Sequence, residues 1–276
     1  MKKIIFFNYF HNGDIHSSRL FVKDIMIKLN VGTAFYYHEL KDNILDDLNI
    51  TKTDIKPNND ELYYEDDDYI YINTWFHVKY GHRYHQCTIE SLYYNFTIIY
   101  KNLGIELDEI SKYIPKIDYS KFKIDKIDNY FNDLKYEKYI FISNGDIKSF
   151  QSDPSNMDFI IDYLSENDKY LVIISNESNI IKNNVISSKI IIGYELDNDL
   201  NENSYISTKC DIIIGRESGP YFFSYVVENV ISEKEQIIIQ ISYVKPFLNE
   251  NYYNKQKNMY RLNNTSSFIP LFEKIK

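Results

Sequence analysis

Short runs rich in isoleucine constrain the fold of this chain more than any other feature. Each run is almost wholly apolar and is bounded by polar residues or glycine, which is typical of a strand buried on both faces of a parallel sheet. Stretches with helical spacing of apolar residues lie between the runs, so the sequence predicts an α/β protein with helices on both faces of its sheets. The clearest runs are Lys3–Asn8, Lys138–Ser143, Tyr170–Ser175, Lys189–Gly193, Asp211–Gly215 and Gln236–Ile241.

The N-terminal part of the chain begins with a strand–helix–strand unit. The strand Lys3–Asn8 is followed by an expected turn at His11–Ile15 and by apolar residues at helical spacing, with Ser17 or Ser18 as the helix cap. A second strand is expected at Thr33–Tyr37. Two strands joined in this way form a right-handed βαβ unit, so both should lie in one parallel sheet.

The second half of the chain repeats this alternation, which favours two Rossmann-like domains whose parallel sheets face a central cleft. The chain has 276 residues, enough for two modest cores. A lysine-rich, irregular segment from Gly104 to Tyr136 separates the two sets of strands. We therefore expect an N-terminal domain of residues 1–120 and a C-terminal domain of residues 121–276.

Further elements complete the predicted domains. The polar and acidic segment before Tyr69 has the composition of a surface loop, and Ser155 is placed to cap a helix. These elements are a loop at Asp54–Asp68, a strand at Tyr69–Trp75, and helices at Thr88–Leu103, Met157–Leu164 and Pro220–Glu228.

Charge and composition narrow the classes of function. Asp and Glu outnumber Lys and Arg by 40 to 31, and the formal net charge of -9 argues against a general nucleic-acid binder. The apolar run at the N-terminus is interrupted too early for a signal peptide, and no stretch approaches the roughly 20 apolar residues that span a bilayer. Cys87 and Cys210 are too few for a disulfide framework and favour a reducing cytoplasm. Peripheral membrane contact and the oligomeric state stay open.

Glycine is scarce, so its positions carry information. Only 8 glycines occur, and Gly13, Gly145, Gly215 and Gly219 follow predicted parallel strands. Ligands of open α/β sheets bind outside these carboxyl ends. Each glycine by itself is explained by a tight turn. Together they favour a ligand-facing rim.

Arginine is scarcer still and points to the same rim. Arg19 lies near the start of the first helix, Arg83 in a histidine-rich loop, and Arg216 directly after a predicted strand. The guanidinium group binds phosphate through a planar fork of donors, so these positions indicate an anionic ligand. Ordinary surface charge is the alternative for each of them.

The loop Gly215–Pro220 is the sharpest of these features. A strand, a turn of small residues and a helix with proline near its start present free N–H groups and a positive dipole end, which suit a diphosphate. The loop is not a Walker motif, because no Gly-Lys-Ser/Thr follows, and it lacks the GxGxxG spacing of the dinucleotide fingerprint.

Two segments resemble the lipopolysaccharide heptosyltransferase family, the ADP-heptose transferases of GT-B fold. The stretch Asp211–Pro220 (DIIIGRESGP) is similar to the family's strand-loop-helix, where Gly-Asn-Asp-Ser-Gly-Pro is usual, so Arg216 replaces Asn and Glu217 replaces Asp. The segment Gly13-Asp14-Ile15-His16-Ser17 resembles the family's Gly-Asp-Val/Ile opening.

The resemblance implies a glycosyltransferase that moves a sugar from a nucleotide-sugar donor to a glycan or lipid-linked acceptor, inverting and without a metal. The nucleotide sugar is then a co-substrate, and no cofactor is expected. Asp14 would be the general base, with His11 and His16 as rivals. The donor phosphates would meet Ser143, Asn144, Gly145, Arg216, Glu217, Ser218 and Gly219, and the acceptor side would hold Asn12, Gly13, Arg19, His82 and Arg83.

Other functions and sites remain as alternatives. A sugar-nucleotide epimerase of the same fold, or a non-catalytic relative that binds glycans or a partner protein, fits the same pattern. His77, His82, His85 and Cys87 are residue types that bind zinc, but their spacing matches no common site, so we expect them to line or cover the acceptor side. The acidic residues Glu65–Asp68 are expected to be a solvated loop.

Overall fold

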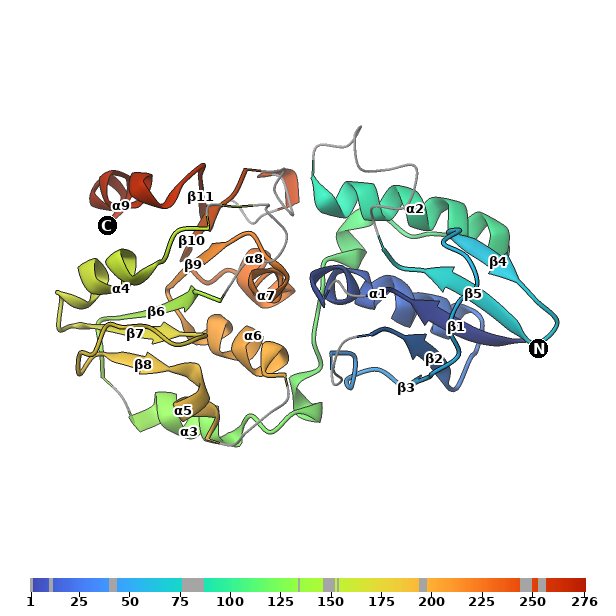
Figure 1. The fold of residues 1–276 in the computed structure, drawn as a ribbon, viewed down its shortest axis with the longest axis horizontal. Helices are drawn as coiled ribbons and strands as arrows, with labels where there is room; N and C mark the ends of the chain where they lie inside the picture. Colours follow the sequence, from blue (N-terminus) through green and yellow to red (C-terminus); the bar gives the residue numbers. More distant parts are fainter. Residues whose placement is uncertain are drawn as a thin grey trace. The chain divides into compact units, whose positions relative to one another are not determined.

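The chain forms two compact units (Figure 1). The first consists of residues 1–121 with 245–252, and the second of residues 122–244 with 253–276. The computed structural model describes residues 2–9, 12–39, 44–75, 87–133, 135–145, 152, 154–193, 198–243, 250–252 and 257–276.

The first unit contains a 5-stranded sheet of order β3-β2-β1-β5-β4 in the described part of the chain. The strands β1, β2, β3 and β5 pair in parallel, as the predicted βαβ unit requires. β4 pairs antiparallel with β5, so the predicted surface loop before Tyr69 contains an edge strand, stabilised by stacking of Tyr64 on Tyr71 at 4.5 Å between ring centroids. The strands are β1 (Lys3–Phe7), β2 (Ala34–Tyr37), β3 (Ile50–Lys52), β4 (Tyr63–Glu65) and β5 (Tyr69–Asn73).

The helix α1 (Asn12–Lys28) begins earlier than the sequence predicts. Residues 12–15 are helical, so the expected turn there is wrong, while His11 lies outside the described residues. Ser17 and Ser18 lie inside the helix and donate hydrogen bonds to the carbonyls of Gly13 (2.6 Å) and Ile15 (3.0 Å). Serine hydroxyls commonly bond back to the preceding turn in this way, and such serines are not caps.

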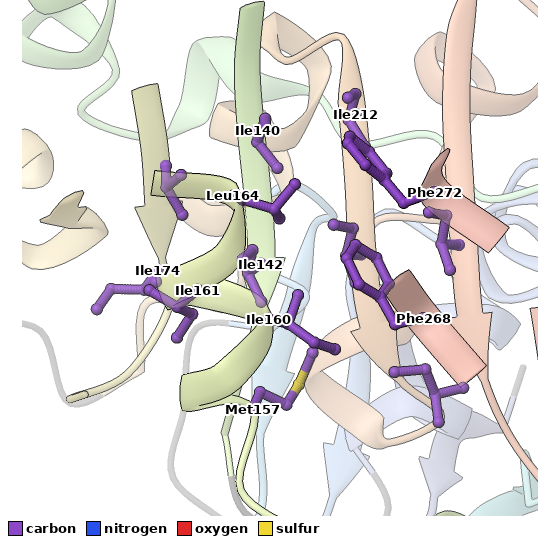
Figure 2. Close-up of a cluster of buried hydrophobic side chains, with 14 of the residues drawn as sticks. Ile140, Ile142, Met157, Ile160, Ile161, Leu164, Ile174, Ile212, Phe268 and Phe272 are labelled. Carbon is purple, nitrogen blue, oxygen red and sulfur yellow. The ribbon is translucent and has the colours of Figure 1, made fainter. Parts of the chain in front are cut away.

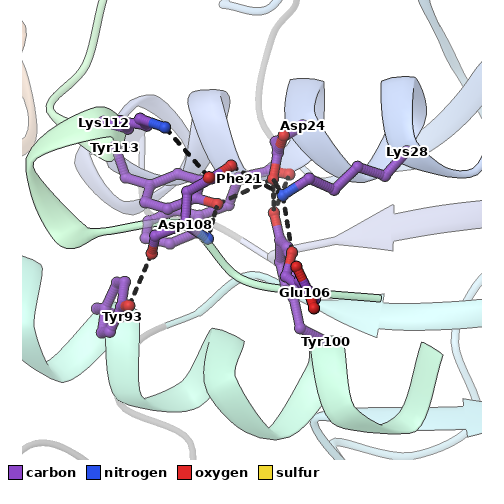
Figure 3. Close-up of polar contacts among 9 residues, drawn as sticks. All are labelled: Phe21, Asp24, Lys28, Tyr93, Tyr100, Glu106, Asp108, Lys112 and Tyr113. Carbon is purple, nitrogen blue, oxygen red and sulfur yellow. Dashed lines mark hydrogen bonds and ion pairs between the residues drawn. The ribbon is translucent and has the colours of Figure 1, made fainter. Parts of the chain in front are cut away.

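The helices of the first unit pack through aromatic rings and a polar network (Figure 3). Phe21 of α1 stacks on Phe96 of α2 (Thr88–Leu103) at 4.2 Å and on Tyr113 at 4.1 Å between centroids. The carboxylate of Asp24 accepts hydrogen bonds from the hydroxyls of Tyr100 (2.7 Å) and Tyr113 (2.9 Å). The hydroxyls that these tyrosines bring into the interior therefore have an ionic partner.

The second unit contains a 6-stranded, fully parallel sheet of order β11-β10-β9-β6-β7-β8. The direction in which successive strands are added reverses between β6 and β9. Two of the predicted runs, Lys138–Ser143 and Gln236–Ile241, are strands with the same bounds. The strands are β6 (Lys138–Ser143), β7 (Tyr170–Ile174), β8 (Val185–Ser187), β9 (Ile212–Arg216), β10 (Gln236–Ile241) and β11 (Lys257–Leu262).

One face of this sheet is covered by α4 (Asp158–Ser165) and α9 (Phe268–Ile275), which form a hydrophobic core with the strands (Figure 2). Leu164 of α4 lies over Ile140 and Ile142 of β6, and Phe268 and Phe272 of α9 lie on the same face. The remaining helices of the described chain in this unit are α3 (Asp125–Asp133), α5 (Ser188–Ile192), α6 (Leu200–Lys209), α7 (Gly219–Phe222) and α8 (Val227–Val230).

Three predictions for the second unit are wrong in detail. The run Lys189–Gly193 is the helix α5, because the Ser187 side chain accepts from the Lys189 N–H and Gly193 ends the helix with a φ of 69°. The helix predicted from Pro220 is broken into the one-turn helices α7 and α8. Ser155 does not cap α4, since its hydroxyl lies 2.7 Å from that of Thr265.

Candidate functional site

The carboxyl edge of the second sheet gathers the residues that the sequence predicts on the donor side. Ser143 is the last residue of β6 and lies beside Gly215 of β9, at the point where the strand order reverses. Asn144 and Gly145 follow β6, and Glu217, Ser218 and Gly219 follow β9, which ends at Arg216. Such a reversal leaves a crevice outside the strand ends, which is where open α/β sheets bind ligands.

A polar cavity of about 320 Å³ opens at this edge. Its volume is near the lower end of the range for ligand pockets. The segment after β7 also lines it, although this segment contains none of the glycines or arginines that mark the other loops. Its Asn-Glu-Ser-Asn follows a predicted strand just as the chosen loops do, and this position was the available signal. The lining residues are Asn144, Pro154, Asn156, Asp158, Asn176, Glu177, Ser178, Asn179 and Arg216.

Asp158, the first residue of α4, is held as a carboxylate in this cavity. It accepts hydrogen bonds from the Ser178 hydroxyl (2.6 Å) and from the side-chain amides of Asn179 and Asn156 (both 2.9 Å). Partial burial acts to raise the pKa of Asp158, but these hydrogen bonds outweigh it and lower the pKa. The cavity therefore contains a fixed negative charge.

Arg216 supplies the positive charge of the cavity, but its guanidinium group is turned toward the backbone. Nη1 donates to the carbonyl of Ser155 (2.9 Å), and Nη2 donates to the carbonyls of Asn144 (3.2 Å) and Gly145 (2.6 Å). The side chain is 4% exposed. Arg216 thus links the loop after β6 to the end of β9. Its positive charge lies next to the backbone carbonyls of this loop.

The residues on both sides of Arg216 have distinct roles in the turn. Ser218 is the N-cap of α7, and its hydroxyl accepts from the Tyr221 N–H (3.4 Å). Gly215 lies under the Tyr221 ring, which a β-carbon at this position would overlap. Glu217 is 1% exposed and faces inward, where its carboxylate accepts hydrogen bonds from Gln240 (2.8 Å) and Ser242. The structure therefore gives Glu217 an interior position, not the ligand-facing position that the sequence predicts.

Asp14 occupies the corresponding edge of the first sheet. It lies in the first turn of α1, close after β1, with Asn12 as the first residue of the helix and the buried Gly13 between them. The side chain of Asp14 is 4% exposed, and burial raises its pKa well above the usual value. Burial also raises the pKa of Tyr36, with a smaller contribution from Asp14, and the Tyr36 hydroxyl lies 2.5 Å from that of Thr74. A carboxyl with a raised pKa beside strand ends is typical of a functional position.

His16 and Arg19 lie deeper in α1, and both are 0% exposed. Arg19 donates to both carboxylate oxygens of Asp47 (2.9 Å each) and to the carbonyl of Ile44 (2.8 Å). Nη1 makes both contacts with Asp47 and Nη2 makes the contact with Ile44, so this buried ion pair fixes the loop before β3 to α1. The predicted contact of Arg19 with an anionic ligand is therefore replaced by a structural role, and the burial of His16 places its ring in the interior.

Comparison with solved structures extends over nearly the whole chain. It is similar to the E. coli heptosyltransferase WaaC with ADP-2-deoxy-2-fluoro heptose, with a TM-score of 0.55 and 7% sequence identity over 99% of this chain and 100% of that one. The structure of WaaC with ADP gives the same values. The chain has the GT-B fold. The glycosyl transferase family 9 structure from Veillonella parvula DSM 2008 is also similar, with a TM-score of 0.52 and 11% identity over 100% of this chain and 89% of that one.

Sequence comparison alone does not reach this GT-B likeness. No protein-family model matches the chain, and no curated protein matches it. The two short segments that resemble the heptosyltransferases are therefore supported by the fold and not by overall sequence similarity.

Several residues expected at the site of this GT-B chain lie outside the described residues. These are His11, His82 and Arg83, together with His77 and His85 of the histidine-rich loop. Cys87, at the end of that loop, is buried directly before α2. Among the described residues, no group of histidine, cysteine and acidic side chains could hold a metal ion. The described helices also include none that is both long and apolar enough to cross a membrane.

Proposed function

We propose that the chain is a glycosyltransferase that moves a sugar from a nucleotide-sugar donor to a glycan or lipid-linked acceptor. The observation that carries this proposal is the GT-B likeness, which extends over 99% of the chain and all of a heptosyltransferase structure containing ADP. A fold alone does not determine an activity. The proposal therefore also rests on the polar residues at the carboxyl edges of the two sheets.

The donor is proposed to bind at the carboxyl edge of the second sheet. The polar cavity there lies at the reversal of strand order, and the turn at Ser218 and Gly219 follows the central strand β9. Arg216 brings a positive charge to this edge, and Asp158 and the surrounding amides offer partners for hydroxyl groups. These groups suit the two chemical parts of a nucleotide sugar, its phosphates and its hydroxyl-rich rings.

Asp14 is proposed as the general base that takes the proton from the acceptor hydroxyl. A base must be ionised, and burial raises the pKa of Asp14 and favours its neutral form. The transfer rate should therefore rise with pH up to this raised pKa. The proposed reaction inverts the anomeric centre, since a single base activates a direct attack, and it uses no metal.

The test compares donor turnover by the unchanged protein and by Asp14→Asn. Each of the ADP-, GDP-, UDP- and CMP-sugars is incubated with the protein and a mixture of glycan acceptors, and the released nucleotide is measured. General-base catalysis is worth about 100-fold to 10,000-fold, so Asp14→Asn should lose activity by that factor. Asp54→Asn, the same change at an exposed position of the first unit, should retain full activity.

Other results would favour the alternatives. Release of a modified sugar without an acceptor would indicate an epimerase. Binding of a nucleotide sugar with no turnover would indicate a non-catalytic relative. Turnover that survives Asp14→Asn would remove Asp14 as the base while leaving the transferase proposal in place.

A further inference from the structure

A chain of buried hydrogen bonds lies directly behind the turn at Ser218. The hydroxyl of Tyr225 donates to Oε1 of Gln240 (2.9 Å), and Nε2 of Gln240 donates to Oε2 of Glu217 (2.8 Å). The hydroxyl of Ser242 donates to the same oxygen of Glu217. All four side chains are at most 1% exposed.

The four side chains come from separate pieces of the second unit. Glu217 follows β9, Gln240 lies in β10, Ser242 follows β10, and Tyr225 follows α7. Polar groups buried this completely are costly unless each finds a partner, and a satisfied network is rigid. The chain of bonds thus fastens the residue after β9 to β10 and, through Gln240, to the segment after α7.

Backbone contacts show that this fastening reaches the turn. The N–H of Glu217 donates to the carbonyl of Ile241 (2.8 Å), which extends the β9–β10 ladder by one residue. The next residue, Ser218, caps α7, and Tyr221 of α7 packs over Gly215. The turn therefore begins at a residue whose backbone and side chain are both held by β10 and the loop after it.

We propose that Glu217 is a positioning residue that holds the Ser218–Pro220 turn, through Gln240 and Ser242, in the conformation that binds the nucleotide. Its side chain faces the interior, so it acts without touching the ligand. The nature of the ligand rests on the proposed function, whereas the holding of the turn does not.

Ionisation of Glu217 should modulate this role. Burial raises the pKa of Glu217 to about 7, and hydrogen bonds from Ser242 and Gln240 and the charge of Arg261 on β11 only partly oppose burial. Tyr221, on the α7 side, has its own pKa raised by burial and by Glu217. The folded chain prefers the protonated carboxyl, so the turn should be held more firmly below neutral pH and loosen as pH rises through this pKa.

The first experiment measures amide hydrogen exchange of residues 218–225, corrected for intrinsic rates, at pH 6 and pH 8. Glu217→Ala removes the acceptor and leaves the buried donors of Gln240 and Ser242 without it, which should speed exchange there by about tenfold. Glu217→Gln keeps an acceptor oxygen for both donors and should match the unchanged protein at pH 6 while losing its pH dependence. Tyr225→Phe removes only the hydrogen bond from Tyr225 to Gln240, and it replaces Glu217→Ala in this test if that variant does not fold.

The control is Glu137→Gln, the same loss of charge in an exposed ion pair with Lys169. It should leave exchange of residues 218–225 unchanged. The proposal is overturned if Glu217→Ala and Tyr225→Phe leave this segment unaffected, or if the exchange increases equally throughout the second unit.

The second experiment measures binding of ADP, GDP, UDP and CMP by calorimetry. If the unchanged protein binds one of them, Glu217→Ala should weaken that binding by about tenfold and Glu217→Gln by less than about threefold. Equal weakening by both variants would show that the charge itself contacts the ligand, which would overturn the positioning role. If none binds the unchanged protein, the proposed function fails, and hydrogen exchange alone decides whether Glu217 holds the turn.

Discussion

The helix layer of the first unit and the core of the second unit are built from different side chains. In the first, Phe21 is stacked between Phe96 and Tyr113. The hydroxyls of Tyr100 and Tyr113 donate to the Asp24 carboxylate (Figure 3). In the second, isoleucine and leucine side chains fill the space between β6, β9 and α4 (Figure 2). Aliphatic packing needs only shape and burial, whereas buried tyrosine also needs a polar partner in the right place. The first layer should therefore depend more on individual hydrogen bonds.

The polar part of the first layer extends to its surface. Lys28 forms ion pairs with Asp24 and Asp108 (2.9 Å each), and Tyr93 donates to the carbonyl of Asp108 (2.7 Å). Two helices and the segment after α2 are thus linked through a few oxygen atoms. Two α/β domains can thus be stabilised by different balances of apolar burial and hydrogen bonding.

The largest expected effect follows from removing the central ring of the aromatic layer. Phe21→Ala should lower the free energy of unfolding by about 3–5 kcal/mol, because the ring is fully buried between two stacked neighbours. Chemical denaturation with a probe for each unit would measure this. Tyr94→Ala, an exposed position on α2, is the control. A loss below about 1 kcal/mol for Phe21→Ala would mean that the layer collapses to fill the gap.

The corresponding test of packing in the second unit adds a β-carbon at Gly215 instead of removing a ring. Gly215→Ala should lower stability by about 1–3 kcal/mol, because the new β-carbon overlaps the Tyr221 ring. The double variant with Tyr221→Leu should lose less than the sum of the single losses, since the smaller side chain gives space. Thermal unfolding of the four proteins gives the coupling. Additive losses would show that the crowding at Gly215 is relieved elsewhere.

Removing a single tyrosine hydroxyl group should lower stability more in the first unit than in the second. Tyr100→Phe should lower stability by about 1–2 kcal/mol, because it removes a hydrogen bond to the Asp24 carboxylate. Tyr163→Phe is the matched change on α4, where the ring of Tyr163 packs edge-on against Phe268 and Phe272. We expect this change to stay within about 0.5 kcal/mol. Equal losses from the two changes, measured by urea denaturation, would contradict the proposed difference between the units.

The smallest effect concerns the ionised Asp158 in the polar cavity. Its folded-state pKa is lowered, so its stabilisation is present above the unfolded pKa and is lost as pH falls through the folded pKa. Asp158→Asn should therefore reduce the melting temperature at pH 7 and have less effect near pH 3. The pKa of Asp14 is raised, so its effect on stability has the opposite dependence on pH. Asp14→Asn should therefore gain stability relative to the unchanged protein as pH rises. Melting curves from pH 3 to pH 8 distinguish these two slopes.

The sequence predicts the buried strands well and the short helices poorly. Runs such as Gln236–Ile241 have polar neighbours that mark both ends, so β10 was predicted with its bounds. The run Lys189–Gly193 has the same appearance, yet its conformation is decided by the cap at Ser187 and the left-handed Gly193. A triplet of isoleucines satisfies either structure. Hydrogen bonds at the ends of such a segment determine whether it is a helix or a strand, and the spacing of apolar residues does not reveal these bonds.

For the candidate site, the sequence predicts which loops meet but not where their side chains point. Ser143 and Gly215 do lie side by side, although Gly215 lies within β9 and not in the turn after it. The direction of Arg216 depends on Ser155, and that of Glu217 on Gln240 and Ser242, which are distant in sequence. Arg19 likewise finds Asp47 only through the fold. Contacts of this kind follow from tertiary packing, which a single sequence does not display.

The parallel pairing of β6 with β9 has a consequence for how the second unit is assembled. These adjacent strands are far apart in sequence, as shown by the bond from the Tyr139 N–H to Asp211, 72 positions away. Closing so long a segment is slow, because its entropy is lost before the sheet contacts are gained. The crevice beside these strands cannot exist until that step is complete. Nucleotide binding at this crevice would therefore report formation of the β6–β9 pair and would be absent from any state of the chain that lacks it.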